Sequence, residues 1–110
     1  MKKWEDMTEE EREAERQRII TNPEMQHCRI IEHEGSRAVW ASKGPIPEKG
    51  TRIAINFNGW GKATVKDHII EQAYFYALAQ VDKIPESFKA RGHDGLVYVA
   101  GVDFKLLEEA

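Results

Sequence analysis

Histidine, cysteine and carboxylate side chains are the groups in this chain that can perform nucleophilic, acid–base or metal chemistry. Of the four histidines, His27 lies next to Cys28, the single cysteine. On a strand, adjacent side chains point to opposite faces, so this pair is not suited to share a metal ion or to act as nucleophile and base. His33, His68 and His93 have no Cys-x-x-Cys or His-x-x-x-His partner. The sequence therefore predicts no metal site and no cofactor.

Histidine adjoins a carboxylate at Asp67-His68 and at His93-Asp94. Either neighbour would in principle orient an imidazole as a general base, but adjacency in sequence does not supply that geometry. His93 lies in a glycine-rich stretch that reads as a solvated loop, and His68 reads as a surface or rim residue. The chain also has no Gly-x-Ser-x-Gly, P-loop or Gly-x-Gly-x-x-Gly motif. We predict no catalytic residues and a non-enzymatic protein; an enzyme built around His68 or His93 is the least favoured alternative.

Aromatic side chains are the better indication of a binding site. Trp60 falls at the tip of an expected turn, where it is hard to bury, and Tyr74 and Tyr76 fall on the strand face opposite Phe75. Contiguous exposed aromatic side chains are typical of protein-binding surfaces. The open alternative is that a neighbouring strand or the N-terminal helix covers them. We therefore name Trp60, Tyr74 and Tyr76 as candidate partner-binding residues.

Three cations, Arg52, Lys62 and Lys66, are expected on the outward strand face beside these aromatic residues. A small barrel that stacks bases on aromatic rings and meets phosphates with such cations is the alternative function, in RNA or single-strand binding. The whole chain, however, carries 16 Lys plus Arg against 19 Asp plus Glu, with a net charge of −3. That acidic balance disfavours a nucleic-acid partner.

Composition limits the class of protein. A length of 110 residues is typical of one domain, and 41% hydrophobic residues suffice for a modest core. A single cysteine allows no internal disulfide and fits a reducing compartment. No apolar signal-peptide core follows the N-terminus, and no run approaches the ~18 apolar residues that span a bilayer. We expect a cytoplasmic protein that does not enter the membrane.

A charged N-terminal helix should precede the strands. Thr8-Glu9-Glu10-Glu11 has the form of a capping box that starts a helix, and Asn22-Pro23 should end it. Few apolar residues follow until Ile19 and Ile20, so this helix should reach the core only through its last turn.

Runs of alternating apolar residues predict the strands, and the segment from Pro45 to Val81 should supply the curled core of the sheet. Ile69-Ile70 breaks the alternation and should mark a bulge or bend. Trp40 is expected in the core and Trp4 as a loose anchor of the tail, and a one-turn helix should follow Pro85. The expected strands are 28–33, 37–42, 52–57, 62–66, 74–81 and 96–104, and the expected interior residues are Ile53, Ile55, Phe57, Ala63, Val65, Phe75 and Ala77.

This order of elements resembles an SH3-like small β-barrel: short strands, a proline-containing loop, a glycine turn, a long bent strand and a single-turn helix before the last strand. The resemblance implies a mainly β fold, a small antiparallel barrel over residues 25–106, preceded by a tail and charged helix over 1–24 and followed by a tail over 107–110. The segment from Gly50 through Gly61 to Val65 is also similar to the KOW form of that barrel, although its glycine spacing differs.

A further resemblance is to uncharacterised small proteins of phages and conjugative elements, for which no activity can be carried over. The residues that carry it are Pro47, Gly50, Asn58, Gly59, Gly61, Glu71, Tyr74, Pro85 and Glu86. It implies a phage or mobile-element accessory protein that inhibits or redirects a host factor, such as a defence system. The expected partner is a host or phage protein. The oligomeric state stays open, and a dimer through the apolar outer face of Tyr74 to Leu78 is one alternative.

Overall fold

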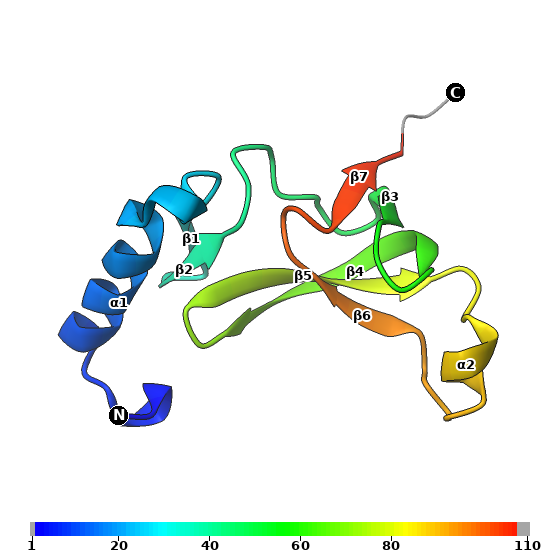
Figure 1. Ribbon diagram of the computed structural model, residues 1–110, viewed down its shortest axis with the longest axis horizontal. Coiled ribbons are helices and arrows are strands. Elements are labelled where there is room, and N and C mark those ends of the chain that lie inside the picture. The colour runs from blue at the N-terminus through cyan, green and yellow to red at the C-terminus, as the bar shows by residue number, and fades with distance from the viewer. Residues whose placement is uncertain (1, 108–110) are drawn as a thin grey trace.

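The strands of this chain form one strongly curled mixed sheet, a half-barrel, in the computed structural model, which describes residues 2–107 (Figure 1). Helix α1 (Glu9–Thr21) lies at one end of the molecule and the short helix α2 (Glu86–Lys89) at the other. The strands are β1 (Arg29–His33), β2 (Ser36–Trp40), β3 (Arg52–Ile55), β4 (Gly61–Glu71), β5 (Tyr74–Val81), β6 (Leu96–Val99) and β7 (Phe104–Leu106).

Strand β5 lies at the centre of the pairing. The order along the sheet is β1-β2-β5-β4-β3-β7, and β6 also pairs with β5. β2 meets the first residue of β5, Tyr74, whereas β6 pairs with the later residues 77–80. The β2–β5 contact is parallel and joins Val39 to Tyr74, so the expectation of a purely antiparallel sheet is wrong. No tight turn connects these two strands, because the proline loop, β3 and β4 intervene, and hairpin geometry therefore does not fix their relative direction.

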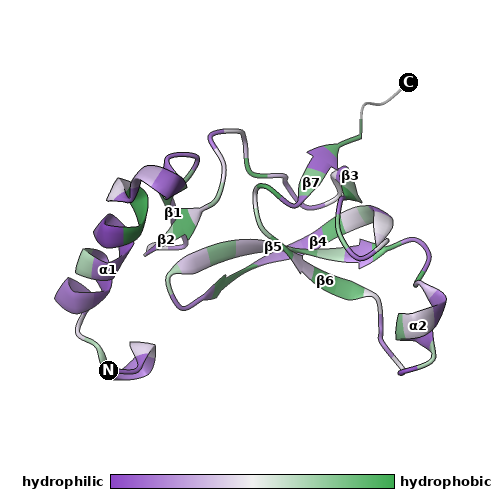
Figure 2. Ribbon diagram, viewed as in Figure 1, coloured by the Kyte–Doolittle hydropathy of each residue, from purple (hydrophilic) through white to green (hydrophobic). Residues whose placement is uncertain are grey.

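Helix α1 begins and ends where the sequence predicts. The capping box at Thr8 is complete, and Asn22 is the C-terminal cap. Figure 2 shows a hydrophilic helix with a hydrophobic band near its end, where Ile19 is buried against the β1–β2 hairpin. One residue departs from the expectation that only the last turn is buried. Arg16 is 4% exposed, with its guanidinium 5.6 Å from the Trp4 ring centre, so Trp4 packs on the helix and anchors the tail.

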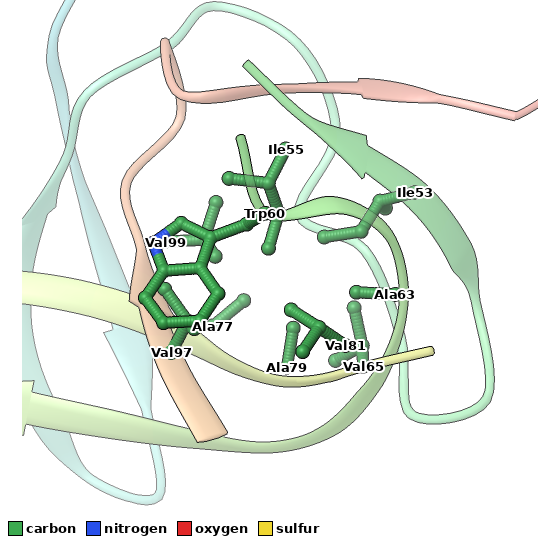
Figure 3. Packing of buried hydrophobic residues seen from close by; sticks show 10 residues of the cluster. All are labelled: Ile53, Ile55, Trp60, Ala63, Val65, Ala77, Ala79, Val81, Val97 and Val99. Atoms are coloured by element: carbon green, nitrogen blue, oxygen red, sulfur yellow. The ribbon is translucent and has the colours of Figure 1, made fainter. Parts of the chain in front are cut away.

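The inner face of the half-barrel is apolar, as the alternation predicts. Side chains from β3, β4, β5 and β6 meet there, and Trp60 lies over them (Figure 3). Six of the seven expected interior residues are buried, while Phe57 is partly buried. Trp40 is fully buried in a neighbouring cluster with Ala38 and Phe75.

The bulge in β4 lies earlier than expected. The register between β4 and β5 shifts between Val65 and Asp67, whereas Ile69 and Ile70 pair regularly with β5. Ile69 points outward and Ile70 inward, because cross-strand partners share a face. Side chains therefore continue to alternate between the two faces through both isoleucines. The sequence pattern did not show this, because the outward-facing Ile69 is as apolar as the inward-facing Ile70.

The expected last strand, 96–104, is two strands. β6 pairs with β5, and β7 pairs with β3 after the turn Ala100–Asp103. Gly101 allows this turn to pass close to Ala41, because an added Cβ would lie 2.6 Å from the Ala41 carbonyl oxygen. Leu107 still donates a backbone hydrogen bond to Arg52, while 108–110 of the expected tail lie outside the described residues. Among the described residues no helix is long and apolar enough to cross a membrane.

Candidate functional site

Trp60 is not the exposed anchor that the sequence predicts. Asn58, Gly59 and Gly61 adopt positive φ, which forms the expected tight turn, but the indole folds back onto the inner face and is 5% exposed. The Phe88 ring stacks on the Trp60 ring with centroids 4.2 Å apart, and the His93 ring lies 4.8 Å away. The short α2 segment and its following loop therefore complete the burial of Trp60 over the inner face.

A pocket of about 420 Å³ remains between the tip of the β3–β4 hairpin and the start of the α2 segment. Trp60 and Ile84 supply apolar wall, and Lys62 and Asp82 stand at its rim. The structure thus places Trp60 and Lys62 in one site, although Trp60 presents little of its ring there.

One of the three expected cations, Arg52, is taken up by an ion pair within the chain. Arg52 donates two hydrogen bonds to Asp82, at 2.7 and 2.6 Å, and a third to the Thr64 hydroxyl at 2.9 Å. The Arg52 guanidinium holds the pKa of the Asp82 carboxyl below its usual range. Lys62 and Lys66 are exposed. Two of the three expected cations are therefore available to a ligand, and the third is neutralised.

A different set of residues forms a continuous outer surface. Tyr74, Tyr76 and Tyr98 follow one another across β5 and β6, with ring centroids 6.4 and 5.9 Å apart. Ile69 pairs with Tyr76 and Leu78 with Tyr98, so both belong to the same outer side of the sheet. We call these five residues the tyrosine face.

Sequence reasoning found Tyr74 and Tyr76 but missed Tyr98, which is 47% exposed and is the most accessible of the three rings. The alternation of β6, in which Val97 and Val99 are buried, would have placed Tyr98 outward. The expected cover by the N-terminal helix applies only to Tyr74, which packs on the cluster that contains Ile19.

The surroundings of Tyr76 are acidic. Burial raises the pKa of the Tyr76 hydroxyl, and the neighbouring Tyr74, Asp103 and Glu71 raise this pKa further. Glu71 pairs with Tyr74 across β4 and β5, whereas Asp103 lies in the turn after β6. The two carboxylates therefore approach Tyr76 from opposite edges of β5.

Two histidines that are far apart in sequence come together on the other side of the sheet. The His33 and His68 rings lie 5.7 Å apart, and His68 stacks on Phe75 at 5.4 Å. The His68 Nε2 lies 2.7 Å from the Pro47 carbonyl oxygen, which fixes the ring at the rim of the inner face. His93 lies in an exposed loop, as the sequence predicts, and its partly exposed ring is held in place because its Nδ1 accepts the Gly95 N–H at 2.9 Å. Residues 2–107 contain no group of three or more metal-ligating side chains.

No protein-family model, curated protein or solved structure matches this chain.

Proposed function

We propose that this protein is a small protein-binding module that engages its partner through the tyrosine face. The observation that carries the proposal is the row of Tyr74, Tyr76 and Tyr98 on the outer side of β5 and β6, with Tyr98 47% exposed. Tyrosine supplies a large contact area at a low cost in conformational entropy, and it is enriched at interface positions that dominate binding energy. Ile69 and Leu78 extend the apolar area between these rings.

Within this proposal the fold is an SH3-like barrel and the partner is a host protein, or a phage protein. Support for the fold comes from the meander β3-β4-β5, the one-turn helix α2 after it, and a last segment that pairs with both β5 and β3. Support for a phage or mobile-element origin is limited to the sequence resemblance. A module of this kind acts on its target by occupying a surface, which suits inhibition or redirection of a host factor.

The alternative of a nucleic-acid-binding barrel is less well supported by the geometry. Trp60 is buried, Arg52 is held by Asp82, and the tyrosine rings lie beside the carboxylates of Glu71 and Asp103. A phosphate backbone that crossed this face would meet negative charge, which opposes binding. Lys62 and Lys66 are the cations that remain available to it.

The test of the proposed function is affinity capture from host lysate with two matched variants. Tyr76→Thr/Tyr98→Thr removes the partly buried Tyr76 ring and the exposed Tyr98 ring and keeps good strand formers. Val102→Thr/Leu106→Thr removes two exposed apolar side chains elsewhere. We expect a partner that the wild type and the second variant retain and the first loses, with unchanged far-UV circular dichroism for all three.

Two results would contradict the proposal. One is capture of the same proteins by the wild type and by Tyr76→Thr/Tyr98→Thr. The other is a salt-dependent shift with single-stranded oligonucleotides that Lys62→Gln/Lys66→Gln abolishes, because this result would select the nucleic-acid alternative.

A further inference from the structure

The charges around the tyrosine face indicate the chemistry of its partner. We propose that this face binds a basic segment of a partner protein and seats a lysine or arginine side chain over Tyr76, between Glu71 and Asp103. The inference rests on the proposed function and adds to it the class of segment that is recognised.

The first step is the placement of the two carboxylates. Glu71 is the last residue of β4 and pairs with Tyr74, next to Tyr76 along the face. Asp103 ends the turn that follows β6, the strand on the other edge of β5. The β5–β6 pairing ends at Ala77 and Val99, so the next residue, Ala100, lies beside Tyr76, and the Asp103 Oδ2 lies 3.1 Å from the Ala100 nitrogen. Tyr76 therefore lies between the two carboxylates along this face.

The second step concerns how firmly these charges are held. The Asp103 Oδ2 accepts a hydrogen bond from the Ala100 N–H at 3.1 Å, and the Asp103 N–H bonds back to the Ala100 carbonyl at 3.0 Å. The carboxylate is therefore fixed in place before a partner arrives. Glu71 is exposed, and within residues 2–107 it makes no ion pair.

The third step is the comparison with nearby cations. Arg18 lies near Tyr74, but its guanidinium is bonded to Glu15. Lys66 stands at the bulge beside Asp67, which itself pairs with Lys49 at 3.5 Å. None of these cations bonds to Glu71 or Asp103 in the part of the chain that the structure describes.

The fourth step is the energetic advantage of a cation in this position. A cation over the face of a tyrosine ring is attracted by the ring quadrupole, and adjacent carboxylates add charge-assisted hydrogen bonds. An acidic or phosphate-bearing partner would meet repulsion at the same place, so the two carboxylates also select against it. An apolar neighbour of the cation would contact Tyr98 and Leu78.

The experiment uses a display library of random linear dodecapeptides, selected on the immobilised full chain in about 50 mM salt, where charge interactions are weakly screened. Selected peptides are then synthesised, and their affinities are measured by fluorescence anisotropy. The first variant, Glu71→Gln/Asp103→Asn, removes both charges and keeps an acceptor oxygen for the Ala100 N–H. The matched control is Glu24→Gln/Glu48→Gln, which removes two exposed carboxylates away from the face.

We expect selected peptides that are enriched in lysine and arginine. Their affinity should fall about tenfold in Glu71→Gln/Asp103→Asn and should stay within about twofold in the control variant. Added salt should weaken the wild type more steeply than the Glu71→Gln/Asp103→Asn variant.

The contradicting results separate this inference from the proposed function. Peptides that lose binding in Tyr76→Thr/Tyr98→Thr but carry no excess of basic residues, or bind Glu71→Gln/Asp103→Asn with wild-type affinity, would overturn the basic-segment inference and leave the tyrosine face as a binding surface. Peptides whose affinity is the same in Tyr76→Thr/Tyr98→Thr and the wild type would overturn the proposed function and this inference with it.

Discussion

At the residue scale, Trp60 is part of the core of the half-barrel. Its indole joins the inner face of the half-barrel to Phe88 and His93, two residues that follow β5 in the chain. One side chain thus fixes both the β3–β4 turn and the α2 segment.

Trp60→Ala should lower the free energy of unfolding by about 3–5 kcal/mol, because it removes a buried aromatic side chain and leaves a cavity that its neighbours fill poorly. Urea denaturation measures this change. Tyr98→Ala, on the exposed face, should change the free energy of unfolding by less than about 1 kcal/mol. If the two substitutions cost the same, the assignment of Trp60 to the core is wrong.

Gly101 is the second residue whose identity the fold requires. Its φ is not positive, so the need arises from space and not from conformation. Gly101→Ala would place a methyl group against the backbone of Ala41, which cannot move as freely as a side chain, and should cost about 1–3 kcal/mol. The control is Gly44→Ala, where the added Cβ meets the Ser42 side-chain oxygen at 3.2 Å. Thermal unfolding that moves equally in both variants would argue against the close approach.

At the element scale, α1 is attached to the sheet by a carboxylate as well as by Ile19. Glu13 accepts two hydrogen bonds from Arg37 of β2, both at 2.9 Å, and one from Arg16 at 2.8 Å. The contact with Arg37 does most to lower the pKa of Glu13 to about 2, followed by a hydrogen bond from the Gln17 Nε2 at 3.1 Å and then by the contact with Arg16.

This depressed pKa gives the helix attachment a defined pH dependence. The folded-state pKa lies below the ordinary value of 4.5, so the stabilisation is complete above pH 4.5 and is lost as the pH falls from there toward about 2. Glu13→Gln should lower the free energy of unfolding by about 1 kcal/mol at neutral pH and flatten its decline in this acid range. Glu10→Gln, on the same helix, should keep the wild-type profile. Parallel profiles for wild type and Glu13→Gln would disprove the role of this ion pair.

The elements also show which parts of the fold local sequence determines. The capping box at Thr8, the glycine turns and the alternation of β3 and β5 depend on neighbours in the chain, and the structure confirms those predictions. The bulge near Lys66 and the division of the last strand depend on pairing with β5 and β3, so the pattern of one segment did not reveal them.

At the scale of the whole molecule, the candidate site was only partly predictable for the same reason. Tyr74 and Tyr76 follow from one strand, but Tyr98 joins them only through the pairing of β6 with β5. Trp60 was misplaced because its cover comes from Phe88, 28 positions along the chain (88 − 60). The ion pair of Arg52 with Asp82 was likewise not predicted, because two strands separate these residues in the chain.

The two surfaces of the sheet consequently differ in burial and composition. The inner face is filled by its own side chains, whereas the outer tyrosine face exposes the Tyr98 ring and the Glu71 carboxylate and holds the Asp103 carboxylate by a hydrogen bond. We expect variants of the outer face to change binding with little change in stability, and variants of the inner face to do the reverse. Paired measurements of thermal unfolding and peptide affinity on the variants named above test this division.

The most direct measurement of the central claim is a ¹H–¹⁵N correlation spectrum of the labelled full chain, recorded while a selected peptide is added. The tyrosine-face assignment predicts that amide signals of Ile69 to Leu78 and of β6 shift together and saturate, whereas signals of Gly59 to Lys62 and Asp82 to Glu86 stay in place. Shifts confined to those last two segments, which line the pocket beside Trp60, would contradict the claim.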